Sequence, residues 1–147
     1  MATRLVKIIL DTSILIPFIN DGVDYLPESD SGEQLLHCFS TVVAMELYAG
    51  AQDRKSAWLL DRLFYAARKT GRIVAPGDGE WQTAGKVLST IGRNEGFKGH
   101  DLMRLTNDLL IALSGKKIGA VVYTANIKDF RLLQKYADFR MTGPVIN

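Results

Sequence analysis

Four carboxylates border or interrupt apolar segments, where an ionised side chain has few ready partners. Asp11 directly follows the apolar run LVKIIL, and Glu46 lies within VVAMELYAGA. Asp108 precedes LLIAL, and Asp129 opens the segment that follows AVVYTAN. An ionised carboxylate on an apolar face is costly unless it is paired or bound to a metal. All four carboxylates lie at the ends of, or within, elements that should converge on one edge of a sheet, so we expect them to form one acidic site.

Each carboxylate also has an ordinary structural interpretation, and the sequence leaves both interpretations open. Asp11 can cap a helix that begins at the next residue. Glu46 has no basic residue three or four positions away, yet it can lie on the exposed edge of its helix. Asp108 and Asp129 stand in first turns of expected helices, where the helix dipole favours a negative charge.

A divalent cation would relieve the repulsion within such a cluster. Like charges a few ångströms apart raise one another's pKa or require a counter-cation. Mg²⁺ takes oxygen ligands and needs only one or two direct carboxylates, and it can polarise a phosphodiester and activate a water for attack. Ser13, Thr124 and Asn126 are candidates for orienting the carboxylates or holding water around them.

Other catalytic chemistry has little support. The two histidines, His37 and His100, lie in poorly patterned segments, so no Ser-His-Asp arrangement is indicated. Cys38 is the single cysteine, so neither an internal disulfide nor a multi-cysteine metal site can form. We expect Cys38 to be a buried apolar residue, and its isolation suits a cytoplasmic protein.

Charge is unevenly distributed along the 147 residues. Residues 1–53 carry two basic and eight acidic side chains, and residues 54–147 carry sixteen basic and eight acidic ones. A basic bulk beside concentrated carboxylates suits a protein that binds a polyanion, although solvated faces explain the same distribution equally well. Apolar residues make up 47% of the chain, and no apolar stretch reaches the roughly 18 residues of a membrane span. We expect one domain over residues 1–147.

The elements that must position these side chains alternate between strand and helix patterns. Strands are expected at residues 5–10, 72–76 and 118–126 and in the tail after residue 137. Helices are expected at residues 12–20, 42–50, 53–70, 79–94, 108–117 and 127–137, with residues 20–34 mostly loop and 97–104 unassigned. Candidate helix caps are Thr12 or Ser13 and Ser40 or Thr41. The alternation favours an α/β sandwich with a mainly parallel sheet, in which functional groups collect beyond the carboxyl ends of the strands.

Three segments together resemble a known family. IILDTSILIPF, STVVAMELYAGA and TNDLLIALSGKKIGAVVYTANIKDF occur in this order over positions 8–130. They resemble PIN-domain proteins, most closely the VapC-type toxins of toxin–antitoxin pairs. The resemblance implies a three-layer α/β/α fold and an acidic metal site. In it, Asp11, Glu46 and Asp108 match the first three acidic positions.

The fourth acidic position is contested in this sequence. The closing motif of the family corresponds to the segment from Thr124 to Phe130, and both Asn126 and Asp129 compete for the role. We prefer Asp129, because Asn126 would bring no charge.

The resemblance implies an endoribonuclease that depends on Mg²⁺ or Mn²⁺ and cleaves RNA with a metal-activated water. The cation would be held by Asp11 and Asp108, with Glu46 and Asp129 completing the metal site. The protein would then be the toxin of a VapBC-type pair. Two alternatives are a non-catalytic PIN-like RNA-binding or regulatory module and a phospho-acceptor α/β domain. The latter lacks the expected second aspartate after Asp11, where Thr12 and Ser13 follow.

The resemblance also implies a small antitoxin partner and a homodimer. The apolar faces of residues 57–67 and 81–91 are candidate surfaces for them, although core packing explains these faces better. Several basic side chains are candidates for contacts with RNA phosphates, or else are simply solvated: Arg54, Lys55, Arg62, Lys86, Arg93, Lys98 and Arg104.

Overall fold

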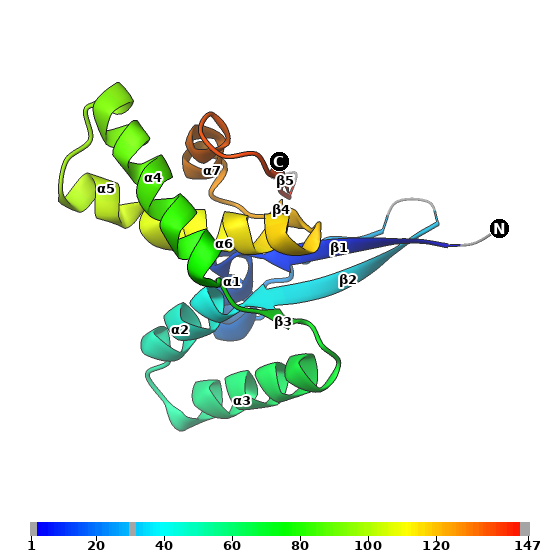
Figure 1. The fold of residues 1–147 in the computed structure, drawn as a ribbon. Coiled ribbons are helices and arrows are strands. Elements are labelled where there is room, and N and C mark those ends of the chain that lie inside the picture. The colour runs from blue at the N-terminus through cyan, green and yellow to red at the C-terminus, as the bar shows by residue number, and fades with distance from the viewer. Residues whose placement is uncertain (1–2, 30–31, 145–147) are drawn as a thin grey trace.

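A computed structural model describes residues 3–29 and 32–144 (Figure 1). These residues form five strands and seven helices. The elements are β1 (Arg4–Leu10), α1 (Thr12–Asp21), β2 (Glu33–Ser40), α2 (Thr41–Gly50), α3 (Arg54–Lys69), β3 (Ile73–Val74), α4 (Asp78–Glu95), α5 (His100–Arg104), α6 (Thr106–Ile118), β4 (Val121–Tyr123), α7 (Ile127–Gln134) and β5 (Arg140–Thr142).

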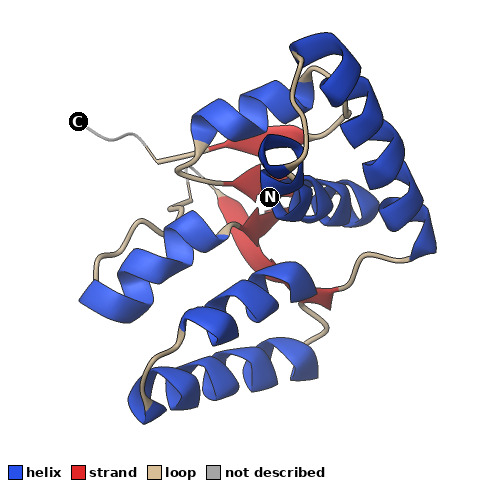
Figure 2. Ribbon diagram, turned by 90° about the vertical axis from the view of Figure 1, so that its left-hand side faces the viewer, coloured by secondary structure: helices blue, strands red, loops and turns tan. Residues whose placement is uncertain are grey.

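The five strands form one parallel sheet in the order β3-β2-β1-β4-β5. Helices lie on both sides of this sheet (Figure 2), so the fold is the predicted three-layer α/β/α sandwich. The central strand β1 is flanked by β2 and β4, and all three end at the same edge of the sheet. Residues that follow these strand ends are therefore brought together from distant parts of the sequence.

Helix α6 lies against the sheet and is buried along most of its length, which explains its nearly uniform apolar sequence. It contacts β1, β2 and β4, and every residue from Leu109 to Gly115 is buried. Gly115 permits the close approach, because a Cβ there would lie 3.0 Å from the Cγ2 atom of Ile9. The position of Asp108, in the first turn of α6, is thereby fixed relative to β1.

The predicted elements are largely confirmed, with three corrections. Strand β2 was missed, and its first two residues were assigned to a loop. Its polar first half pairs with the exposed start of β1, from Arg4 opposite Glu33 onwards, so only residues 38–40 are buried and no clear pattern marks the strand. Strands β3 and β4 are shorter than predicted. Strand β4 begins late because α6 extends to Ile118 and the chain then turns through Gly119 at a φ of 69°.

The third correction concerns the first helix cap. Thr12 and Ser13 are not the cap. Asp11 is the N-cap of α1, which confirms the ordinary structural interpretation of this residue, and its side chain accepts a hydrogen bond from the Ser13 backbone N–H. Ser40 caps α2 as predicted, since its Oγ accepts from the Val42 N–H at 3.1 Å. The tail contains the expected strand, β5, while residues 145–147 lie outside the described residues. No helix in the described part of the chain is long and apolar enough to cross a membrane.

Candidate active site

The carboxyl ends of β1 and β4 place Asp11 beside Thr124. Leu10 pairs with Tyr123 in the sheet, and the Asp11 N–H then donates to the Tyr123 carbonyl at 3.0 Å. The residues that directly follow this pair, Asp11 and Thr124, have buried side chains: Asp11 is 3% exposed and Thr124 is fully buried. The end of the sheet thus fixes a carboxylate in a polar pocket formed by the chain itself.

Hydroxyl groups hold the Asp11 carboxylate in one orientation. Its Oδ2 atom accepts from Ser13 Oγ at 2.7 Å and from Thr124 Oγ1 at 2.8 Å. These hydroxyls are held in turn by the backbone, since the Ala125 N–H donates to Ser13 and the Asn126 N–H donates to Thr124. The sequence indicated that Ser13 and Thr124 could orient the acids, and the structure places both of them on Asp11.

Glu46 reaches the same site from α2. Its Oε1 accepts a hydrogen bond of 2.7 Å from Thr12 Oγ1, and its Oε2 accepts a longer one of 3.4 Å from Asn107 Nδ2. Thr12 Oγ1 also lies 3.4 Å from Asp11 Oδ1, so this hydroxyl connects the two carboxylates. Sequence reasoning missed Thr12 and Asn107 as site residues. Their adjacency to Asp11 and Asp108 was the only available signal.

Asp108 and Asp129 meet through Asn126. The Asn126 Nδ2 group donates to Asp108 Oδ2 at 3.3 Å and to Asp129 Oδ2 at 3.2 Å. The two candidates for the fourth acidic position are thus in contact with each other, and both lie at the site. Asp129 is also paired with Arg104, whose Nη1 lies 2.7 Å from the same Oδ2 atom.

The pKa of Asp108 responds to the charges of the other three acids. Burial raises its pKa to about 7, and the charges of Asp11, Glu46 and Asp129 act in the same direction. The Arg104 guanidinium opposes this shift. A carboxyl that keeps its proton near neutral pH reflects an excess of negative charge in a partly buried site.

The donor set fits a hard divalent cation. It consists of carboxylate, hydroxyl and amide oxygens and their excess negative charge, which Mg²⁺ and Mn²⁺ favour. Within residues 3–29 and 32–144, no three His, Cys, Asp or Glu side chains lie close enough together to ligate one ion. A cation at this site would therefore combine one or two direct carboxylates with water, which is the usual arrangement for Mg²⁺.

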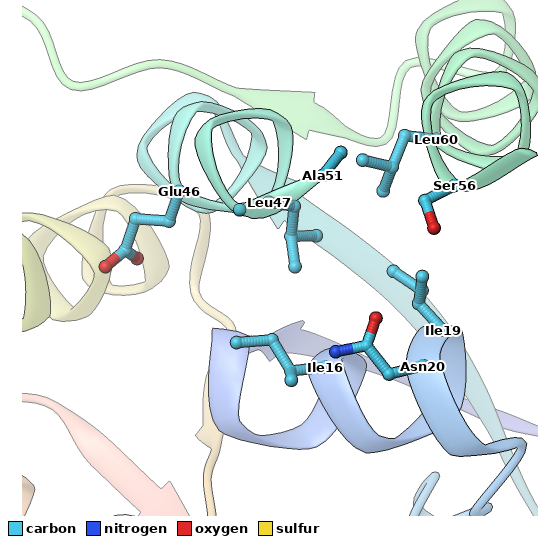
Figure 3. Close-up of a pocket in the computed structure, with 9 residues that line it drawn as sticks. Ile16, Ile19, Asn20, Glu46, Leu47, Ala51, Ser56 and Leu60 are labelled. Carbon is cyan, nitrogen blue, oxygen red and sulfur yellow. The ribbon is translucent and has the colours of Figure 1, made fainter. Parts of the chain in front are cut away.

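A small apolar cleft lies beside the acids but differs from them in character. It has a volume of about 60 Å³, lies between α1, α2 and α3, and includes Ile16, Ile19, Leu47 and Leu60 in its lining. Figure 3 shows Glu46 at one end of this cleft, with its carboxylate directed away from the apolar side chains. The polar chemistry is therefore at the sheet edge and not inside the cleft.

The remaining candidates from the sequence lie elsewhere. Cys38 is buried as predicted, and His100 is exposed on α5. His37 is half-buried on β2, where burial and the nearby Arg72 lower its pKa. On the face of residues 81–91, Trp81 is exposed whereas the other apolar side chains are buried or partly buried in the core: Ala84, Val87, Leu88 and Ile91.

This chain is similar to known proteins in its structure and not detectably in its sequence. No protein-family model matches the sequence, and no curated protein matches it. Solved structures do match. VapBC-1 from nontypeable Haemophilus influenzae superimposes with a TM-score of 0.62 at 21% identity, covering 94% of this chain and 98% of that one.

Two further complexes give the same result. VapBC2 from Rickettsia felis, solved with a DNA fragment from its promoter, matches with a TM-score of 0.61 at 20% identity over 94% of this chain and 98% of that one. VapBC-5 from Mycobacterium tuberculosis matches with a TM-score of 0.58 at 14% identity, covering 96% and 99% of the two chains.

These matches define the class of fold. The chain has the fold of the VapC components of VapBC toxin–antitoxin complexes. The PIN-like fold that the three sequence segments predicted is therefore confirmed.

Proposed function

We propose that this protein is a metal-dependent endoribonuclease and the toxin of a VapBC-type toxin–antitoxin pair. The observation that carries the proposal is the convergence of Asp11, Glu46 and Asp108 at the carboxyl end of the sheet, where burial, and then the charges of the neighbouring acids, raise the pKa of Asp108 to about 7. The VapC-like fold supports the same assignment.

Asp11 and Asp108 would hold Mg²⁺ or Mn²⁺, with Glu46 and Asp129 completing the acidic cluster. When bound, the cation polarises a phosphodiester and activates a water for in-line attack. The negative charge of the carboxylates would attract the cation to the site, and the bound cation would offset the repulsion between these carboxylates and the RNA phosphates.

The residues around the acids supply preorganisation. Ser13 and Thr124 fix the Asp11 carboxylate by two short hydrogen bonds, and Thr12 fixes Glu46 by a third. Groups held in this way do not need to reorganise when a cation or substrate binds, which is how partners around metal ligands raise affinity and activity.

An antitoxin partner and a homodimer belong to the same proposal. The similar solved structures are VapBC and FitAB complexes, which supports a small protein partner for this chain. Exposed apolar side chains on α1 and α2, namely Ile16, Phe18 and Met45, are available for such contacts.

Cleavage of total cellular RNA by the purified, antitoxin-free protein tests the proposal. Reactions contain Mg²⁺, Mn²⁺ or EDTA, and an Asp108→Asn variant is run alongside. Asp78→Asn is the matched control, because Asp78 is an exposed aspartate in the first turn of another helix, α4.

We expect discrete fragments with either metal, none with EDTA or Asp108→Asn, and normal cleavage by Asp78→Asn. Undiminished cleavage by Asp108→Asn contradicts the site assignment. Folded protein that binds RNA but cleaves it under no condition supports the alternative, a non-catalytic RNA-binding or regulatory module.

A further inference from the structure

The acidic site has a cation of its own. Within residues 3–29 and 32–144, Arg104 is the only lysine or arginine within ion-pair distance of the four carboxylates. Its Nη1 donates to Asp129 Oδ2 at 2.7 Å, and its charge also acts on Asp108. A guanidinium therefore lies at the edge of a site that otherwise carries only negative charge.

The backbone around Arg104 is firmly anchored. The next residue, Leu105, is fully buried, and Leu102 packs against the core from the same short helix, α5. Leu102 lies over Gly92 of α4, where a Cβ would come within 3.5 Å of its Cδ2 atom. Apolar side chains on either side thus fix α5, so the placement of Arg104 does not depend on its ion pair alone.

The Arg104 side chain keeps most of its hydrogen-bonding capacity. It is 47% exposed, whereas the Asp129 side chain is only 18% exposed. A guanidinium has five N–H donors in a planar fork, and the structure uses one of them, on Asp129. The remaining donors are available to a ligand that approaches the acids from solvent.

Asp129 has the connections of a positioning residue. A single oxygen, Oδ2, accepts from Arg104 and from Asn126, and Asn126 continues to Asp108. Asp129 therefore holds the guanidinium at a defined place relative to Asp108.

We propose that Arg104 binds a phosphate of the RNA beside the acidic site and that Asp129 acts by positioning its guanidinium. The proposal rests on the proposed ribonuclease function and adds a residue to it. A planar guanidinium is well suited to phosphate oxygens, and a cation next to the carboxylates offsets their repulsion of a polyanion. A purely structural ion pair between α5 and α7 is the competing explanation.

RNA binding separates the two explanations without relying on cleavage. The Asp108→Asn variant serves as the background, so that the RNA stays intact, and Mg²⁺ is present throughout. The affinity for a fluorescently labelled single-stranded RNA of mixed sequence is measured over a range of salt concentrations. Arg104→Gln, Arg104→Lys and Arg140→Gln are compared in this background.

Arg140 provides the matched control. It is an exposed arginine with a hydrogen bond to the Gly119 carbonyl. It opens β5, opposite Val121 at the start of β4, and so lies at the end of the sheet away from the acids. Its substitution removes the same charge from the protein at a different place.

We expect Arg104→Gln to weaken RNA binding about tenfold and to reduce the slope of log affinity against log salt by about 0.7, the value for one phosphate contact on a single strand. Arg104→Lys is expected to retain the slope, and Arg140→Gln to change neither quantity. In a protein that already carries Asp129→Asn, Arg104→Gln should weaken RNA affinity by less than about threefold, because the two residues act together.

Three results overturn the inference. The first is an effect of Arg104→Gln no larger than that of Arg140→Gln. The second is an equal loss of RNA affinity on Arg104→Gln whether residue 129 is Asp or Asn, which refutes the positioning role of Asp129. The third is RNA binding too weak to detect at low salt with Arg104 intact. Each can occur in a protein whose wild type cleaves RNA, so failure here is distinguishable from failure of the proposed function.

Discussion

Replacing Asp108 with asparagine is expected to stabilise the metal-free protein in neutral and alkaline solution. Burial and the charges of Asp11, Glu46 and Asp129 raise the pKa of Asp108 from 3.8 to about 7. Asparagine keeps the size of the side chain and an oxygen that accepts from Asn126, but it carries no charge. The same substitution that is expected to abolish cleavage should therefore make the fold more stable.

The sign follows from proton binding. The folded protein holds the Asp108 proton up to a pKa of about 7, whereas the unfolded chain releases it at the ordinary value of 3.8. The contribution to stability is thus fully present below about pH 4 and is lost as the pH rises to about 7. Asparagine has no proton to lose, so its advantage over aspartate grows through this range and then levels off.

The magnitude has a clear upper limit. A shift of about three pKa units at about 1.4 kcal/mol per unit gives a ceiling near 4 kcal/mol. Asp108 is only partly buried, and solvent screening therefore reduces the expected gain to about 2 kcal/mol above neutral pH. A difference of this size is a large fraction of the stability of a typical domain.

Urea unfolding in EDTA, at several pH values between about 4 and 8, measures this difference. The wild type, Asp108→Asn and the control Asp78→Asn are compared. We expect the gap between Asp108→Asn and the wild type to widen with pH, and Asp78→Asn to follow the wild type. A gap that is constant with pH would refute the reasoning, because it would mean that neither burial nor the neighbouring acids raise the pKa of Asp108 in the folded protein. Saturating Mg²⁺ should stabilise the wild type more than the variant.

Two further substitutions test the surroundings of Asp11. Ser13→Ala removes a hydrogen bond of 2.7 Å to Asp11, so Mn²⁺ affinity measured by calorimetry should fall about tenfold; an unchanged affinity would contradict the orienting role. Gly143→Ala would bring a Cβ into overlap with the Thr124 carbonyl oxygen, so the free energy of unfolding should fall by about 2 kcal/mol. Wild-type stability in urea would show that this contact is easily relieved.

Local pattern was sufficient for much of the fold. The apolar run before Asp11 predicted β1, and the buried helix α6 and the amphipathic helix α3 were recognised from their own residues. Asp11 also stood out locally, because an acid that directly follows an apolar strand falls at the carboxyl end of a parallel sheet. These features depend on neighbours within a few residues, which a sequence displays directly.

Strand β2 shows where local pattern fails. Its pairing with β1 joins residues about thirty positions apart, and its polar first half carries no alternation that would distinguish it from a loop. The strand is stabilised by backbone hydrogen bonds to its neighbour, and these do not depend on which side chains it carries.

The sequence by itself determined the fold class and identified the four acids as candidates. Only the tertiary structure showed that Thr12 bridges Asp11 and Glu46, and that Asn126 donates a hydrogen bond to Asp129. It also brought Arg104 to Asp129 across 25 residues. Such pairs form because the ends of parallel strands and the helices packed on them converge at one edge of the sheet, and no local pattern encodes that convergence.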